Sequence, residues 1–181
     1  MPGINGAGVD KTWTRALVWA AMAGLVAIDV LYLAVIHFQN DPGPADVLTV
    51  PFVATYLAAM AILLGGSLVS PAAARPVLRA AVSSGLVVLA VLAAFSIGAL
   101  ILVVAGLAVA TTFPALGVQK SPKIRVAAGV ASLVAAVVLV GGLELTSRYL
   151  VCPGTGSSGG TTGGFFGQVS YECDNGRLTI R

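Results

Sequence analysis

Long apolar runs, separated by short segments rich in proline, glycine and charged residues, organise most of the chain. A helix of about 20 apolar residues is long enough to cross the hydrocarbon core of a bilayer. The pattern predicts spans over residues 13–38, 50–69, 77–95, 97–113 and 126–145, within a transmembrane region covering residues 11–147. Trp13 and Phe38, at the two ends of the first span, fit the aromatic belts found at membrane interfaces. Pro51 is expected in the first turn of the second span, where proline is tolerated.

The stretch from Val77 to Phe113 carries one charge, Arg79, and allows two interpretations. As one helix it would be about 54 Å long, which exceeds a hydrocarbon core of about 30 Å by more than tilting absorbs. We therefore expect two short spans joined by a tight turn at Phe95-Ser96-Ile97-Gly98, in which Gly98 supplies the backbone freedom. A four-span arrangement, with this stretch as one helix, is the alternative.

The basic residues favour five spans with a cytoplasmic N-terminus, because Lys and Arg gather on the cytoplasmic side of membrane proteins. In that arrangement Arg148 is the basic residue that lies outside and close to a span, whereas four spans would place Lys120, Lys123 and Arg125 outside. Residues 1–10 are then a disordered cytoplasmic lead-in, and Asp10 is a candidate N-cap for a helix starting at Lys11. Residues 148–181 form an extracytoplasmic tail. The cytoplasmic basic residues are Lys11, Arg15, Arg75, Arg79, Lys120, Lys123 and Arg125.

The tail combines a predicted flexible linker, the Gly/Ser/Thr run at residues 154–164, with a predicted β-hairpin. Asn175-Gly176 is the preferred pair for a two-residue type I′ turn. An isolated two-stranded hairpin is marginal in water, so its apolar face needs cover. The register pairs Asp174 with Arg177, Cys173 with Leu178, Glu172 with Thr179 and Tyr171 with Ile180. The apolar face consists of Val169, Tyr171, Cys173, Leu178 and Ile180.

Cys152 and Cys173 are the two cysteines of the chain, and both lie in this tail. They do not form the C-x-x-C pair of a thiol–disulfide oxidoreductase. A disulfide persists in an oxidising extracytoplasmic compartment. We therefore predict a structural disulfide between them, which stabilises the tail by about 3 kcal/mol in the chain-entropy model.

Asp29 is the one acidic residue placed deep in a predicted span. A carboxylate at that depth costs roughly 2.5–3.5 kcal/mol on insertion scales, so it normally faces the protein interior or finds a partner. It suggests either a proton or cation site, or one hydrogen bond that locks the first span to a neighbour. Tyr32 follows on the same helical face. The other candidate partners are Thr55, Tyr56, Ser83 and Ser84.

Glu144 and Arg148 are spaced to form an ion pair at the outer end of the last span, with Arg148 reaching toward the interface. His37 is the single histidine and has no ligand-type residue at metal-binding spacing. The sequence therefore predicts no metal site, no cofactor and no catalytic residue.

Composition narrows the class of protein further. The chain is 57% hydrophobic and only 9% charged, whereas soluble domains carry about 25% charged residues. This excludes a soluble enzyme and a disordered protein. The net charge of +3 does not indicate nucleic-acid binding, because no basic run alternates with aromatics. The abundance of Ala, Val, Leu and Gly suggests a bacterial protein.

These features predict an all-α integral membrane protein of the bacterial plasma membrane, built as a five-span bundle with a small C-terminal β-hairpin. Its expected partners are the lipid bilayer and other membrane-protein subunits. Three functions are compatible with the sequence. The favoured one is an accessory or assembly subunit that uses its outer tail as a contact element. The alternative is a small proton-coupled carrier using Asp29. A membrane enzyme acting on lipid or thiol substrates has least support.

Overall fold

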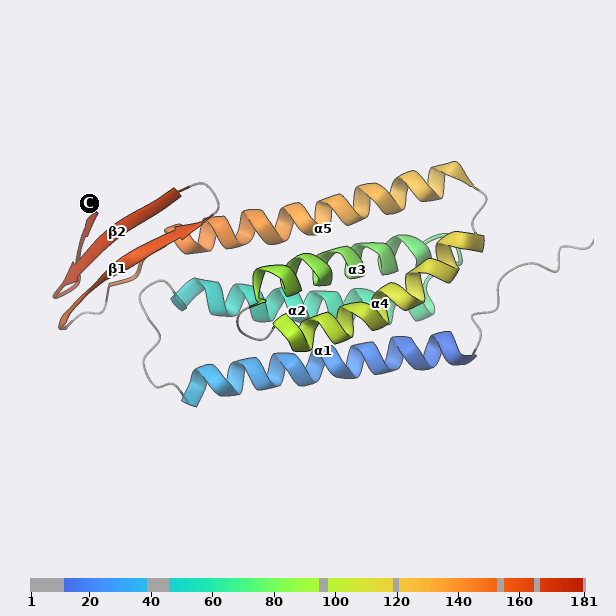
Figure 1. The fold of residues 1–181 in the computed structure, drawn as a ribbon, viewed down its shortest axis with the longest axis horizontal. Coiled ribbons are helices and arrows are strands. Elements are labelled where there is room, and N and C mark those ends of the chain that lie inside the picture. The colour runs from blue at the N-terminus through green and yellow to red at the C-terminus, as the bar shows by residue number, and fades with distance from the viewer. Residues whose placement is uncertain are drawn as a thin grey trace, which may run out of the picture. The chain divides into compact units, whose positions relative to one another are not determined.

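The computed structural model describes residues 12–38, 46–94, 98–118, 121–152, 155–164 and 167–180. These residues form helices and a small antiparallel sheet (Figure 1). The residues divide into two compact units. The helical unit comprises Met1–Val30 and Leu57–Val137, and the sheet unit comprises Leu31–Tyr56 and Val138–Arg181. The elements are α1 (Thr12–Phe38), α2 (Asp46–Val69), α3 (Arg75–Leu92), α4 (Gly98–Val118), α5 (Pro122–Arg148), β1 (Ser157–Gly164), β2 (Gly167–Asp174) and β3 (Arg177–Ile180).

The predicted membrane fold is confirmed by the length and apolar character of the helices. Four described helices, α1, α2, α3 and α5, are long and apolar enough to cross a bilayer. The apolar part of α4, Gly98–Phe113, is shorter. The described chain is therefore a multi-span membrane protein.

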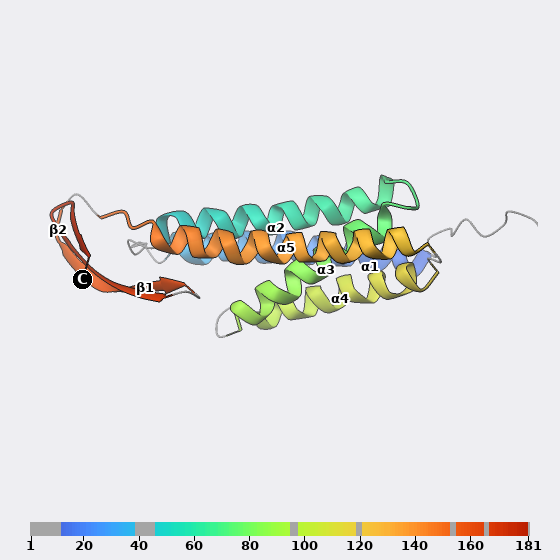
Figure 2. The ribbon, with the colours of Figure 1, turned by 90° about the horizontal axis from the view of Figure 1, so that it is seen from above.

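The predicted break within residues 77–113 is present. Helix α3 ends at Leu92 and α4 begins at Gly98, and the two helices lie side by side and antiparallel (Figure 2). The Gly98 N–H donates to the Ala93 carbonyl at 2.8 Å. A Cβ at Gly98 would lie 2.5 Å from the Ala93 oxygen and 2.6 Å from the Ala90 oxygen, so this close approach requires glycine. Residues 95–97 of the predicted turn lie outside the described residues.

Several helices are longer than the hydropathy pattern predicts. Helix α2 starts at Asp46, which places Pro51 inside the helix and not in its first turn. Helix α5 starts at Pro122, a residue preferred at the first helical position, and it continues to Arg148. Predictions for residues 1–10, Lys11 and Lys120 lie outside the described residues.

The core of the helical unit is formed by apolar side chains from each helix. Leu25 of α1, Leu64 of α2, Leu86 of α3 and Ile101 of α4 are fully buried. Helices approach closely where a glycine removes the side chain: a Cβ at Gly24 would lie 2.8 Å from the Val104 Cγ2 atom. Small residues of this kind allow close packing between membrane helices.

The sheet unit contains the predicted hairpin and one further strand. The β2–β3 register is the one predicted, with Cys173 opposite Leu178 and Asp174 opposite Arg177. Asn175 and Gly176 have φ values of 47° and 81°, as a type I′ turn requires. The strand order is β1-β2-β3.

The prediction that residues 154–164 form a flexible linker is wrong for its later part, since residues 157–164 form β1 and pair with β2 along their length. A Gly/Ser/Thr run has no apolar alternation from which a strand could be predicted. The partner strand β2 supplies side-chain contacts that the glycines of β1 lack. A Cβ at Gly160 would lie 3.2 Å from the Tyr171 hydroxyl, so the tyrosine covers the glycine. Such aromatic cover stabilises glycine in a strand.

Candidate functional site

Asp29 lies on α1 in the helical unit, and one oxygen of its carboxylate is buried. Its Oδ1 atom is buried and has no hydrogen-bond partner among the described residues. Three of the hydroxyls proposed as partners bond elsewhere. Ser84 Oγ donates to the Ser132 carbonyl at 3.1 Å, Thr55 Oγ1 donates to the Pro51 carbonyl at 2.7 Å, and Ser83 is engaged on α3 and α4. The hydrogen bonds described for these three hydroxyls therefore do not include Asp29.

A buried polar cluster joins α2, α3 and α4 within the helical unit. Arg79 is only 1% exposed, and its Nε donates to Ser67 Oγ at 3.3 Å. Ser83 Oγ donates to the Arg79 carbonyl and lies 2.8 Å from Thr112 Oγ1. Thr112 Oγ1 also lies 2.9 Å from the Ala108 carbonyl. Because the Ser83 hydrogen is donated to Arg79, the single Thr112 hydroxyl hydrogen is shared between the Ala108 carbonyl and Ser83 Oγ. These bonds satisfy polar groups that would otherwise be costly inside an apolar bundle.

The sequence predicts Arg79 only as a marker of the cytoplasmic side and does not predict its burial. Its signal is the spacing to Ser83, which places both side chains on one helical face. Arg75, in the same predicted basic turn, donates from Nε to the Ser70 carbonyl at 2.9 Å. Arg75 therefore binds a carbonyl at the C-terminal end of α2, where carbonyl groups carry partial negative charge. Arg79 binds the Ser67 hydroxyl near that end. The two arginines connect α2 to α3.

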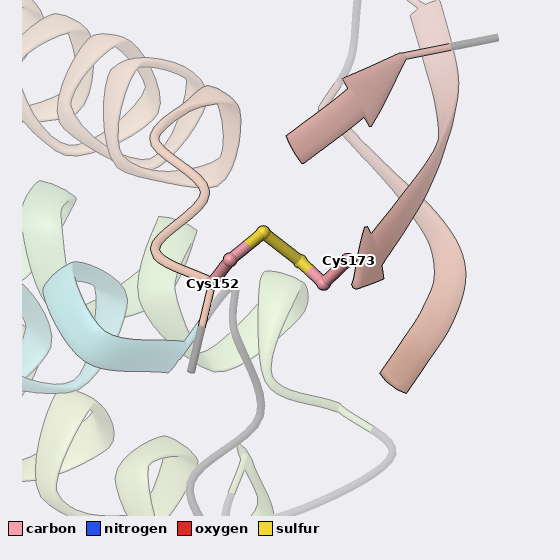
Figure 3. The surroundings of a disulfide bond; sticks show 2 residues. All are labelled: Cys152 and Cys173. Atoms are coloured by element: carbon pink, nitrogen blue, oxygen red, sulfur yellow. A yellow bond between two sulfur atoms is a disulfide. The ribbon is translucent and has the colours of Figure 1, made fainter. Parts of the chain in front are cut away.

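The Cys152–Cys173 disulfide attaches the sheet to the segment that follows α5 (Figure 3). The two Cα atoms are 5.5 Å apart, and Cys173 is fully buried. A second anchor lies on the same side of the sheet: Thr162 Oγ1 donates to the Ser147 carbonyl at 2.9 Å. Thr162 pairs with Val169, which shares a face with Cys173 by strand alternation. The predicted apolar face is therefore the anchored face.

The anchored face is buried at Cys173 of β2 but exposed at β3. Leu178 is 41% exposed and Ile180 is 63% exposed, although both share the face of Cys173 through the register. Strand β3 is also an edge of the three-stranded sheet. An edge strand presents backbone groups that a further strand can pair with.

Glu144 and Arg148 form an ion pair in the last turn of α5. Arg148 Nη2 and Nε donate to the same Glu144 Oε1 atom at 2.6 and 2.9 Å. The Arg148 side chain is 59% exposed and that of Glu144 is 12% exposed. The pair completes the helix end and leaves the arginine head accessible.

The described residues contain no group of three or more His, Cys, Asp or Glu side chains that could hold a metal ion. His37 makes an edge contact with the Phe38 ring, with ring centroids 6.1 Å apart. Comparison of the chain with protein-family models, with curated proteins and with solved structures finds no match. The fold defines the class as a multi-pass membrane protein.

Proposed function

We propose that this protein is a non-catalytic subunit of a bacterial plasma-membrane complex, and that its C-terminal sheet is the contact element for a partner subunit. The observation that carries the proposal is the exposed apolar edge of the sheet. Leu178 and Ile180 are left uncovered on a strand whose sheet is held by a disulfide and by the Thr162–Ser147 bond. A rigidly anchored edge strand pays little ordering entropy when it binds.

The sheet edge favours a partner of defined chemistry, namely an extended extracytoplasmic segment of another membrane protein with apolar side chains at alternate positions. Such a segment can add to β3 through main-chain hydrogen bonds, while its alternate side chains contact Leu178 and Ile180. The disulfide supports an extracytoplasmic position for the sheet, since such bonds persist in oxidising compartments. The basic residues Arg75, Lys123 and Arg125 lie at the starts of α3 and α5 in the helical unit, and they support a cytoplasmic position for these two helix starts.

The test compares two double variants of the same strand. Leu178→Ser with Ile180→Ser removes the exposed apolar side chains. Arg177→Gln with Thr179→Ala is the matched control on the opposite face of β3. A partner that co-purifies with the wild type at fixed stoichiometry in mild detergent should be lost from the first variant and kept by the control. A photo-crosslinker at position 180 should then join that same protein. A strictly monomeric wild type, or equal recovery in all three, would refute the proposal.

A second function, a proton-coupled carrier, is favoured by one observation: the buried Asp29 Oδ1 atom without a hydrogen-bond partner among the described residues. If Asp29 carries protons, Asp29→Asn should abolish proton flux in proteoliposomes, whereas Asp29→Glu should retain part of it. If the carboxylate has no transport role, Asp29→Asn should leave flux unchanged and should not destabilise the protein, because a neutral amide is less costly in the membrane.

A further inference from the structure

A groove of about 540 Å³ lies in the helical unit, lined by residues of α3, α4 and the first half of α5. This volume falls within the range of about 300–1,000 Å³ that is typical of small-molecule sites. Its lining includes Ala80 and Ala128, which are 7% and 3% exposed, and the apolar side chains of Phe113 and Leu116. The interior surface is thus largely apolar.

Two of the residues that line the groove are glycines. Gly117 and Gly129 each have open space where a Cβ would stand, with no atom within 4 Å. Phe113 at the same groove is 72% exposed, and Val130 on α5 is 57% exposed. In a membrane-spanning chain such exposed apolar side chains contact lipid, so the groove opens on a lipid-facing surface.

One end of the groove carries a positive charge. Arg125 lines it from the first turn of α5, where the helix dipole adds partial positive charge. Ser132, which also lines the groove, is seven residues further along α5, about 10 Å along the helix axis. The groove therefore has a cationic end and an apolar length, which matches an amphiphile with an anionic head.

We propose that this groove binds an anionic phospholipid, with the phosphate beside Arg125 and the upper part of an acyl chain against Ala80 and Ala128. Basic pockets between membrane helices are known sites for anionic headgroups. The surrounding bilayer supplies the ligand at high local concentration. The site is in the helical unit and does not depend on the function proposed for the sheet.

Two pairs of variants test the groove, and each pair combines a change in the groove lining with a control outside it. Gly129→Leu fills the groove from a position with free space and replaces glycine by a better helix former. Gly141→Leu is its control on the same helix, also with free space but outside the groove lining. Arg125→Gln removes the charge, and Lys123→Gln removes a charge two residues earlier that does not line the groove.

The experiment measures lipid binding to the purified full-length chain by native mass spectrometry. The probes are phosphatidylglycerol and phosphatidylcholine with identical acyl chains, and inorganic phosphate serves as the chain-free competitor. We expect the wild type to retain phosphatidylglycerol in preference to phosphatidylcholine. Arg125→Gln should weaken that binding about fivefold, Gly129→Leu should abolish it, and both controls should bind like the wild type. Circular dichroism checks that each variant is folded.

Three results would overturn the proposal. Equal retention of the two lipids by the wild type would exclude headgroup recognition, and this comparison needs no variant. Wild-type binding by a folded Gly129→Leu protein would place the lipid elsewhere. Displacement of the lipid by inorganic phosphate would show a simple phosphate site in place of a lipid site.

Discussion

Reduction of the Cys152–Cys173 disulfide is expected to release the C-terminal sheet from the rest of its unit while leaving the helices folded. The bond joins residues 21 positions apart. Closing a loop of this length is worth about 3 kcal/mol in the chain-entropy model. Because each 1.4 kcal/mol changes an equilibrium constant tenfold, the open state of the sheet should become on the order of 100 times more populated.

The assay is hydrogen–deuterium exchange of the oxidised and the reduced wild-type protein in lipid nanodiscs. Reduction changes no side chain other than the two cysteines, so it avoids the cavity that an alanine at the buried Cys173 would leave. Amides that pair β1 with β2 should exchange on the order of 100 times faster after reduction. Amides within α3 serve as the internal control and should keep their rates.

An acceleration below about tenfold would refute the reasoning, because it would mean that strand pairing and the Thr162–Ser147 bond suffice to hold the sheet. The variant Thr162→Val separates these contributions. Loss of that single hydrogen bond to the Ser147 carbonyl should cost about 1 kcal/mol. Its effect on exchange should therefore be clearly smaller than that of reduction.

Three further predictions concern the helices. Gly98→Ala should lower the unfolding free energy by about 1–3 kcal/mol, because its Cβ would meet carbonyl oxygens at 2.5 and 2.6 Å. Gly106→Ala, with open space at that position, is the control. Equal stability of the Gly98→Ala variant and the wild type would contradict the close approach. A double-mutant cycle of Ser83→Ala and Thr112→Val, read by detergent unfolding, should give a coupling of about 0.6 kcal/mol, and zero coupling would argue against the bond. Arg148→Gln should change stability by less than about 1 kcal/mol in the same assay, since its side chain is 59% exposed; a larger loss would show that the pair is effectively buried.

The C-terminal hairpin shows how local sequence can specify a register. The Asn175-Gly176 turn and the alternation on both sides of it are contiguous, so the strand pairing follows without distant contacts. The strand β1 could not be predicted in this way. Its residues are glycine, serine and threonine, and their pairing depends on β2, on Tyr171 over Gly160 and on the end of α5.

The candidate sites also differ in how much of each can be predicted from local sequence. Asp29 stands out in the sequence because a carboxylate in an apolar run is unusual, but the sequence does not indicate which hydroxyls bond elsewhere. For Arg79, the sequence does not predict burial. A charge near a helix start is normally a topology marker, and only the tertiary fold brings Arg79 to within hydrogen-bonding distance of Ser67 on α2.

The number and order of the apolar helices, the break before Gly98 and the β2–β3 hairpin are all determined by residues close together along the chain. Hydropathy, glycine geometry and strand alternation act over a few neighbouring residues, so the sequence alone predicts their outcome. The burial of Arg79, the strand β1, the bare apolar edge of β3 and the groove beside Arg125 are set by tertiary packing. Each depends on which surfaces of distant segments meet, and local patterns carry no information about that.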